Sequence, residues 1–268
     1  MRRIIKLLTP PFIFLVIRNA LKLIPRQNSG INCENYENPK LIKSVIEKSI
    51  LAKGDIENSQ KIKIDSFRIL VAFALGHCEI ESIVDIGGAA GYHYFSARTA
   101  LPKKQIKWVV VETRMLVQEA QKNRELDDIT FCDNIPDAFK SLSYNVDLVY
   151  SSRAFQYLED PIQSLKEIIE LKPRYIFLTG IAFSPDYKVH EITQVSELKD
   201  NGPQYSRSRI RNEAVAYKLK LYPKSMFEEI IKSEYSIKLQ IDEDQAGYLL
   251  KGKPIPFNGI WAVRKTNL

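Results

Sequence analysis

Cysteine is scarce in this sequence: 268 residues contain three, at Cys33, Cys78 and Cys132. An odd number at these spacings fits neither a disulfide framework nor a zinc site, so we expect reduced thiols in a cytoplasmic protein. Apolar runs of about 20 residues, the length that spans a bilayer, are also missing. Hydrophobic residues still make up 45% of the chain, enough for the core of one large domain.

Acidic residues are missing from the first 33 positions. The basic residues in that stretch are Arg2, Arg3, Lys6, Arg18, Lys22 and Arg26. Subtracting these six charges from the net charge of +7 leaves +1 for the rest of the chain. A nucleic-acid-binding protein usually spreads basic residues over its working face, so we expect no nucleic-acid partner.

Residues 1–25 form a basic, apolar segment that contains Pro10 and Pro11. Such a segment is typical of one that lies on an anionic membrane surface, and it is equally compatible with a helix packed on the domain. We expect an N-terminal segment and linker at residues 1–37 and a single domain at residues 38–268. The expected location is the cytoplasm, with peripheral contact to the inner membrane face.

The most informative stretch is Ser82 to Gly91, which reads S-I-V-D-I-G-G-A-A-G. Its apolar, β-branched start predicts a buried strand, and the small residues predict a turn before a helix. Backbone N–H groups face a ligand in this geometry. A dinucleotide fingerprint would need its third glycine where Tyr92 or His93 stands, which argues against a nicotinamide-dependent oxidoreductase.

The spacing resembles the first motif of the class I S-adenosylmethionine (SAM)-dependent methyltransferases. The matching residues are Asp85, Gly87, Gly88, Ala89 and Gly91. The resemblance implies that this turn lies under the amino-acid end of SAM and that the strand acid reaches toward it. Ala89 stands where the family usually has glycine, which is tolerable if its φ is negative. A turn without a ligand is the alternative.

A second buried strand, Lys107 to Glu112, ends in an acid 21 positions after Gly91. The two oxygens of a carboxylate match the two hydroxyls of a ribose, so Glu112 is the expected ribose partner. A third strand is expected at Ile129 to Asp133. There the resemblance implies adenine contacts from Cys132 and Asp133, although an aspartate after a strand is also a common turn residue.

A fourth strand, Val146 to Ser152, leads into R-A-F-Q-Y-L-E-D-P. The resemblance places Ser151 and Ser152 beside the sulfonium and makes Tyr157 part of the wall of the cleft. Tyr157 is therefore a candidate catalytic residue, with plain core packing as the alternative. Arg153 is bulkier than the small residue expected there, which indicates either an anionic substrate or a site that has drifted from the family's activity.

The region from Ile181 to Leu221 has the least regular pattern. It holds a basic run at residues 207–220 and His190, which is the preferred candidate for a general base because histidine titrates near neutrality. His93 is the other candidate, placed near the cofactor. The region is either a solvated loop or a pocket for an acidic acceptor.

The remaining pattern alternates helices and strands. Two helices are expected before the first strand, one of them from Pro39 to Gly54 and the other from about residue 60 to 75. Two final strands, 235–241 and 259–264, are joined by a long connection. We therefore predict an α/β fold with a doubly wound, mostly parallel seven-stranded sheet and a C-terminal antiparallel pair.

The finer resemblance is to a methyltransferase family associated with bacterial polysaccharide biosynthesis. Its cues are the D-I-G-G-A-A-G and F-Q-Y-L-E-D-P strings. The resemblance implies SAM as cofactor and O-methylation of a sugar or glycan precursor. No metal-ligand spacing is present, so a metal-independent enzyme is expected. A non-catalytic SAM-fold module that scaffolds a membrane-associated assembly complex is the alternative.

Overall fold

The computed structural model describes residues 36–59, 67–203, 213–250 and 253–265. The expected membrane-contact segment 1–25, and residues 26–35 of the expected linker, lie outside these ranges, as does the part of the basic run before residue 213. Within the described ranges, no helix combines the length and the apolar character needed to cross a bilayer.

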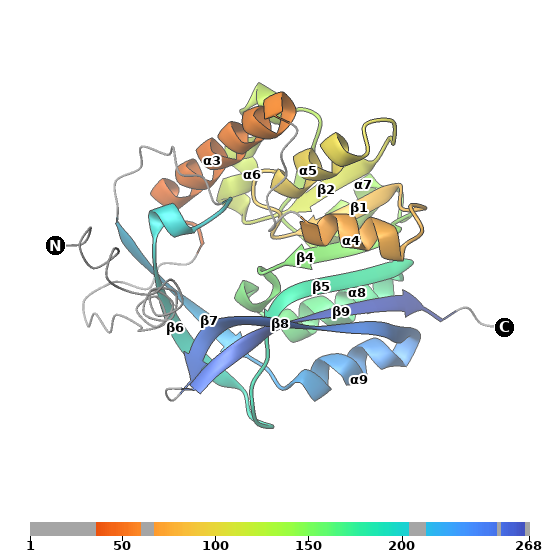
Figure 1. Cartoon of the computed structure of the whole chain (residues 1–268), viewed down its shortest axis with the longest axis vertical. Coiled ribbons are helices and arrows are strands. Elements are labelled where there is room, and N and C mark those ends of the chain that lie inside the picture. The colour runs from red at the N-terminus through yellow and green to blue at the C-terminus, as the bar shows by residue number, and fades with distance from the viewer. Residues whose placement is uncertain (1–35, 60–66, 204–212, 251–252, 266–268) are drawn as a thin grey trace, which may run out of the picture.

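The core of the fold is one seven-stranded sheet with the order β3-β2-β1-β4-β5-β9-β8 (Figure 1). Strands β1 to β5 are parallel, and β9 and β8 complete the sheet as antiparallel strands. The bounds are β1 Ser82–Ile86, β2 Lys107–Val111, β3 Thr130–Cys132, β4 Leu148–Ser152, β5 Tyr175–Ala182, β8 Tyr235–Leu250 and β9 Lys253–Arg264. The predicted mostly parallel sheet with an antiparallel C-terminal pair is confirmed.

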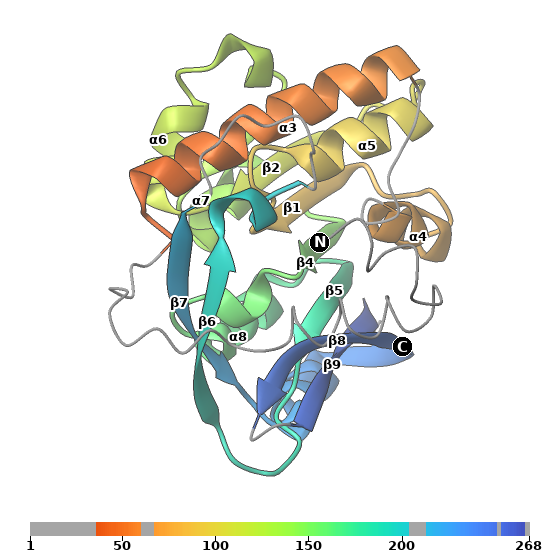
Figure 2. The ribbon, with the colours of Figure 1, turned by 60° about the vertical axis from the view of Figure 1, so that its left-hand side comes forward.

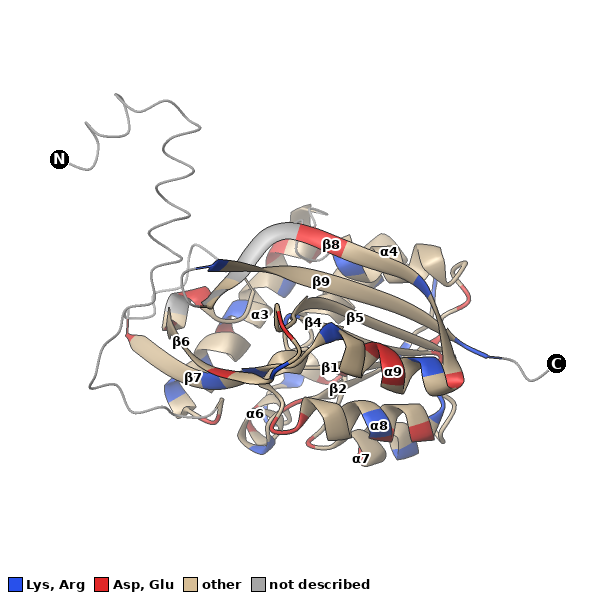
Figure 3. Ribbon diagram, turned by 90° about the horizontal axis from the view of Figure 1, so that it is seen from below, with Lys and Arg blue, Asp and Glu red and all other residues tan. Residues whose placement is uncertain are grey.

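Helices cover both faces of the sheet (Figures 1 and 3). One face carries α3 Pro39–Ser59, α4 Phe67–Leu75, α5 Tyr92–Ala100 and α6 Arg114–Ala120, and the other carries α7 Ile135–Ser141, α8 Pro161–Leu171 and α9 Lys224–Glu234. Successive strand residues alternate between the two cores: Ile83 packs with the first group, and Val84 and Ile86 pack with the second. Charges of both signs lie along α8 and α9 (Figure 3).

Helix α3 differs from the expectation because it continues through Gly54 to Ser59. A glycine in a helix interior costs about 1 kcal/mol relative to alanine. Burial of Ile56 two residues further along offsets that cost, since its side chain is only 3% exposed. The C-terminal strands are also longer than expected, so residues 242–258 form most of a hairpin rather than a connection.

The described parts of the region from 181 to 221 do not form an irregular loop. Its main feature is an antiparallel hairpin of β6 (His190–Glu197) and β7 (Ala214–Leu221), a second sheet beside the first. In β7, Tyr217, Leu219 and Leu221 face the core and alternate with exposed Lys218 and Lys220. The short helix η4 (Leu198–Asp200) follows β6 and packs against α3 (Figure 2). This hairpin forms a wall at the end of the sheet where a ligand would enter.

Candidate functional site

A cavity of about 930 Å³ lies at the carboxyl ends of the parallel strands. Its lining includes Gly87 and Gly88 after β1, Glu112 after β2, Asp133 after β3 and Ser152 at the end of β4. Helix α3 and the β6–β7 hairpin close it from above and from the side. Open α/β sheets bind their ligands at this edge, and the volume is within the range of small-molecule sites.

The turn after β1 requires two of its three glycines for their backbone angles. Gly87 has φ +71° and Gly91 has φ +82°, values that side chains other than glycine rarely adopt. A Cβ on Gly87 would overlap Ala154, and a Cβ on Gly91 would overlap Ile129. Gly91 therefore lies under the turn and does not line the cavity, while Gly87, Gly88 and Ala89 do.

The backbone conformation of Ala89 differs from the expected one. Its φ is +53°, so the backbone is left-handed and not in the negative-φ region that we expected. For an alanine this conformation costs roughly 1–2 kcal/mol. It aims the Ala89 N–H at Glu112 Oε1, at 2.9 Å. The turn thus keeps the shape of a glycine-rich turn, with the strain borne by one residue.

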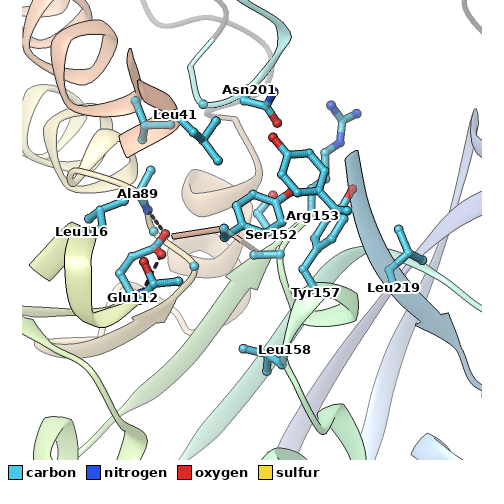
Figure 4. A pocket seen from close by; sticks show the side chains of 18 of the residues that line it. Leu41, Ala89, Glu112, Leu116, Ser152, Arg153, Tyr157, Leu158, Asn201 and Leu219 are labelled. Atoms are coloured by element: carbon cyan, nitrogen blue, oxygen red, sulfur yellow. Dashed lines mark hydrogen bonds between the residues drawn. The ribbon is translucent and has the colours of Figure 1, made fainter. Parts of the chain in front are cut away.

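Glu112 lies where the sequence predicts a ribose partner. Its Oε1 accepts from Ala89 N–H and its Oε2 accepts from Thr113 N–H at 3.1 Å (Figure 4). Burial raises the pKa of Glu112 to about 7, against the two backbone hydrogen bonds that lower it. An ionised carboxylate offers about four acceptor positions. Two are occupied here, which leaves two for a vicinal diol.

Asp85 does not line the cavity. It is fully buried behind Gly88, and its carboxylate lies 3.0 Å from His93 Nδ1. Since an ionised carboxylate only accepts, Nδ1 of His93 donates to it, and this hydrogen bond fixes the orientation of the ring. His93 does line the cavity. The acid expected to face the ligand therefore contacts a histidine that lines the cavity and does not line it itself.

The other predicted cofactor residues divide into two groups. Asp133 and Ser152 line the cavity. Ser151 is fully buried and donates to the carbonyl of Ile86 at 2.9 Å. Cys132 packs against the core, and its carbonyl accepts from Glu112 N–H at 3.0 Å. Ser151 and Cys132 thus support the edges of the strands and do not face the cavity.

Four tyrosines, Tyr36, Tyr157, Tyr217 and Tyr248, line one part of the cavity and contact one another. Tyr36 stacks on Tyr217 with centroids 4.3 Å apart and meets Tyr157 edge-on at 5.1 Å. Figure 4 shows Tyr157 and Arg153 across the cavity from Ala89 and Glu112. We call this part the tyrosine end.

The tyrosine hydroxyls form a directed hydrogen-bond chain. Gln156 Nε2 donates to Tyr248, whose hydroxyl is 2.6 Å from that of Tyr157, and Tyr157 donates to Gln194 Oε1. Burial raises the pKa of Tyr157 well above its ordinary value. Tyr157 therefore stays protonated near neutral pH. It forms the wall that the sequence predicts, with the properties of a binding group and not of a base.

The geometry does not bring His190 to this site. His190 is not among the lining residues, and its Nε2 lies 2.8 Å from Asp186 Oδ1 at the far end of β6. Within the described ranges, no three His, Cys, Asp or Glu side chains are grouped so that they could hold a metal ion.

Two residues, one that lines the cavity and one that supports its lining, could not be identified from the sequence. Fully buried Lys48 of α3 donates to the carbonyls of Leu198 and Asn201, at 3.1 and 2.7 Å, and so holds η4 over the cavity. Arg68 of α4 lines the cavity and pairs through two nitrogens with Glu243 of β8. The alternation of apolar and basic residues in β7 is the one signal that could have revealed part of this wall.

No protein-family model matches this sequence, and no curated protein matches it either. Solved structures do resemble it. A glycopeptide N-methyltransferase, MtfA, complexed with SAM is 13% identical, with a TM-score of 0.45, over 75% of this chain and 94% of that one. A SAM-dependent methyltransferase from Clostridium acetobutylicum is 11% identical, with a TM-score of 0.47, over 79% and 96%.

A third similar structure is the N-terminal domain of EvdMO1 with S-adenosylhomocysteine (SAH) bound. It is 12% identical, with a TM-score of 0.45, over 77% of this chain and 82% of that one. These likenesses are distant, at 11–13% identity.

Proposed function

We propose that this protein is a SAM-dependent methyltransferase. The observation that carries the proposal is the pairing of a left-handed, side-chain-poor turn with a buried carboxylate at the next strand end, both facing one cavity. That pair places a turn with little side-chain bulk directly beside a carboxylate that can accept from a ribose diol.

The residues present fit the cofactor. A Cβ on Gly88 would overlap the buried Asp85 carboxylate, so glycine here makes room for that acid. Gly87, Gly88 and Ala89 bring little side-chain bulk to the cavity that they line. Thr113 Oγ1 is buried beside Glu112 and has no hydrogen-bond partner within the described residues. In the proposed complex Glu112 holds the ribose hydroxyls and Thr113 is a further polar contact. Leu116 and Asp133, which follow β2 and β3, border the adenine end.

At the other end of the turn, His93 contacts the amino-acid portion of the cofactor, and Asp85 fixes the orientation of its ring. When bound, SAM supplies a methyl group activated by a sulfonium. Transfer to an acceptor is an in-line displacement that depends mainly on proximity and orientation. The chain's main contribution is then to align the acceptor, a task for the tyrosine end.

We further propose that the acceptor is an oxygen of a sugar or polysaccharide precursor. Aromatic rings with polar edges, as in Tyr36 and Tyr157, suit a ring that has both apolar faces and hydroxyls. Gln194 and Ser152 add hydrogen-bonding groups to the same cavity. His93 replaces His190 in this proposal as the histidine near the reaction, since His190 does not line the cavity.

Calorimetric titration tests the cofactor assignment. The protein should bind SAM and SAH at micromolar concentrations and should not bind NAD. Gly87→Val should abolish binding, because its side chain would enter the space of Ala154 and strain a left-handed backbone. Gly54→Ala, in the exposed part of α3 where a Cβ meets nothing, is the matched control and should bind normally.

A mass-spectrometric assay with labelled SAM and purified glycan precursors then tests transfer. A non-catalytic SAM-fold module would bind the cofactor but give no labelled product with any acceptor. Absence of SAM binding at millimolar concentration in the folded protein would refute both versions.

A further inference from the structure

The hydrogen-bond chain of the tyrosine end has a fixed direction, which is set at Gln156. This residue is only 3% exposed, and its Nε2 lies 3.3 Å from the carbonyl oxygen of Gly180. A carbonyl oxygen only accepts, so the amide must present its NH2 group at that point and not its own oxygen. The other N–H of the same group donates to the hydroxyl of Tyr248, at 3.1 Å.

The hydroxyl protons of the chain follow from this anchor. Tyr248 accepts from Gln156 and donates to Tyr157, whose hydroxyl is 2.6 Å away, and Tyr157 donates to Oε1 of Gln194. The reverse order would leave the proton of buried Tyr248 without an acceptor among the described residues. Tyr36, whose hydroxyl also interacts with that of Tyr157, can only donate to it, because Tyr157 has a single proton.

The NH2 group of Gln194 is the polar group that this chain leaves for a ligand. Gln194 lies on β6 opposite Tyr217 of β7, and side chains paired in this way project from the same face of a hairpin. Both residues line the cavity. Oε1 of Gln194 is occupied by Tyr157, and no described residue accepts from its Nε2. Two N–H donors with a fixed orientation therefore remain.

Charged groups of the cavity lining do not change this polarity. Glu191, on the same strand, is exposed and already has a lysine partner at 3.1 Å. The charge of Arg153 interacts with that of Glu243 and is not needed here. Two further acids of the lining, Glu37 and Glu159, are exposed, so solvent screens their charges.

We propose that Gln194 determines which acceptors this site takes: its N–H groups hold a saccharide through an oxygen and discriminate against a protonated amine at the same position. A hydroxyl, ether or carbonyl oxygen accepts from an amide N–H, whereas an ammonium group has only donors. An ammonium group that faces these N–H groups loses hydrogen bonds to water and gains none. This inference rests on the proposed function and narrows its acceptor to saccharides without a free amine at this position.

Glucose and four amino derivatives, which carry an amine in place of the hydroxyl on carbon 2, 3, 4 or 6, test the inference. Each is titrated by calorimetry at pH 6, where the amines are protonated, into the full chain saturated with SAH. Gln194→Glu replaces the NH2 group by an oxygen that accepts, and Gln194→Met removes both donors. Gln118→Glu, at an exposed position of α6 outside the cavity lining, is the matched control.

In the unmodified protein at least one amino derivative should bind about tenfold more weakly than glucose, the usual effect of an unpaired polar group. The carbon that carries its amine identifies the hydroxyl that faces Gln194. Gln194→Glu should remove or reverse the discrimination, Gln194→Met should remove it, and Gln118→Glu should retain it. Circular dichroism and an SAH affinity within about twofold of that of the unmodified protein report that each variant is folded.

The inference is overturned if all four amino derivatives bind as tightly as glucose, or if the discrimination survives in either folded variant of Gln194. It is also overturned, together with the sugar assignment, if none of the five sugars binds. In each case SAH binding by the unmodified protein leaves the methyltransferase assignment intact. Failure of the unmodified protein to bind SAH overturns the proposed function itself.

Discussion

Replacing Glu112 by glutamine tests the cofactor site most directly, because both carboxylate oxygens already accept from backbone N–H groups. Ala89 N–H lies 2.9 Å from Oε1 and Thr113 N–H lies 3.1 Å from Oε2. An amide must turn its NH2 group toward one of these donors and loses that hydrogen bond. It also loses the charge that a ribose diol would share, so SAM affinity should fall by about 1–3 kcal/mol.

The pKa of Glu112 adds a pH dependence to this loss. Burial raises that pKa to about 7, so the ligand-free carboxyl is mostly protonated at pH 6 and mostly ionised at pH 8. A diol binds the ionised form, and the ionised fraction changes about tenfold over this interval. SAM affinity should therefore rise by about tenfold, or ~1.4 kcal/mol, from pH 6 to pH 8 and then level off.

Calorimetric titration of SAM at pH 6, 7 and 8 in two buffers of different ionisation enthalpy measures both the affinity and the protons released. Unmodified protein should release close to one proton per SAM at pH 6. Glu112→Gln should release none from this position. Glu229→Gln, on an exposed part of α9 outside the cavity lining, is the matched control and should behave like the unmodified protein.

Protons released by the ligand's own groups are the same for all three proteins. The difference in proton release between the unmodified protein and Glu112→Gln therefore reports on Glu112 alone. The reasoning is refuted if Glu112→Gln binds SAM as tightly as the unmodified protein. It is refuted as well if the tenfold rise persists in that variant.

Three further predictions concern stability. Ala89→Gly should raise the free energy of unfolding by about 1 kcal/mol, since glycine adopts φ +53° without strain, and calorimetry should show a melting temperature about 2–4 °C higher; an unchanged or lower value would contradict the strain argument. Because the pKa of Glu112 is raised, the folded ligand-free protein binds more protons than the unfolded chain between about pH 4.5 and 7. The free energy of unfolding measured in urea should therefore fall as pH rises through that window. Glu112→Gln should reduce this fall. Lys48→Met should lower the free energy of unfolding by about 1–3 kcal/mol and weaken SAM binding, because the carbonyls of Leu198 and Asn201 lose their buried donor. Lys43→Met, at an exposed position of α3, is the control. Equal effects of the two substitutions would count against the role of Lys48.

The sheet could be predicted because its strands are buried on both faces and read as short apolar runs between turn signals. Lys107 to Val111 is such a run, and the structure places its strand there. Helix α8 begins at Pro161, where proline in the first turn and the capping side chain of Asp160 mark a start that sequence alone reveals. Local chemistry decides both features, so no long-range information is needed.

Longer-range contacts decide what the sequence does not reveal. The acidic stretch around Asp242 and Glu243 has the composition of a loop, yet it continues β8. Glu243 is stabilised there by Arg68 from α4, 175 positions away. Tyr36, Tyr217 and Tyr248 come from three distant segments and meet only in the folded chain. No spacing rule connects them.

The dependence on long-range contacts also explains why the sequence favoured His190, which does not line the cavity. A pattern can mark a histidine in a loop, but only the sheet registers decide which end of a strand reaches the cavity. His190 pairs with Leu221 at the outer end of the hairpin, whereas Gln194, four positions later, faces Tyr157. His93 lies on the first turn of α5, beside the glycine turn, and reaches Asp85 because the turn reverses the chain.

Two strained backbone positions lie at this site. Ala89 and Arg153 are non-glycine residues with left-handed φ, and both line the cavity, on opposite sides (Figure 4). Such strain of roughly 1–3 kcal/mol at each position persists only where the surroundings over-determine the conformation. At Ala89 the determinant is Glu112, which fixes the turn; at Arg153 it is Gly180, which makes room for the side chain. The two strained non-glycine positions therefore both lie at the cavity that the proposed function assigns to cofactor and acceptor.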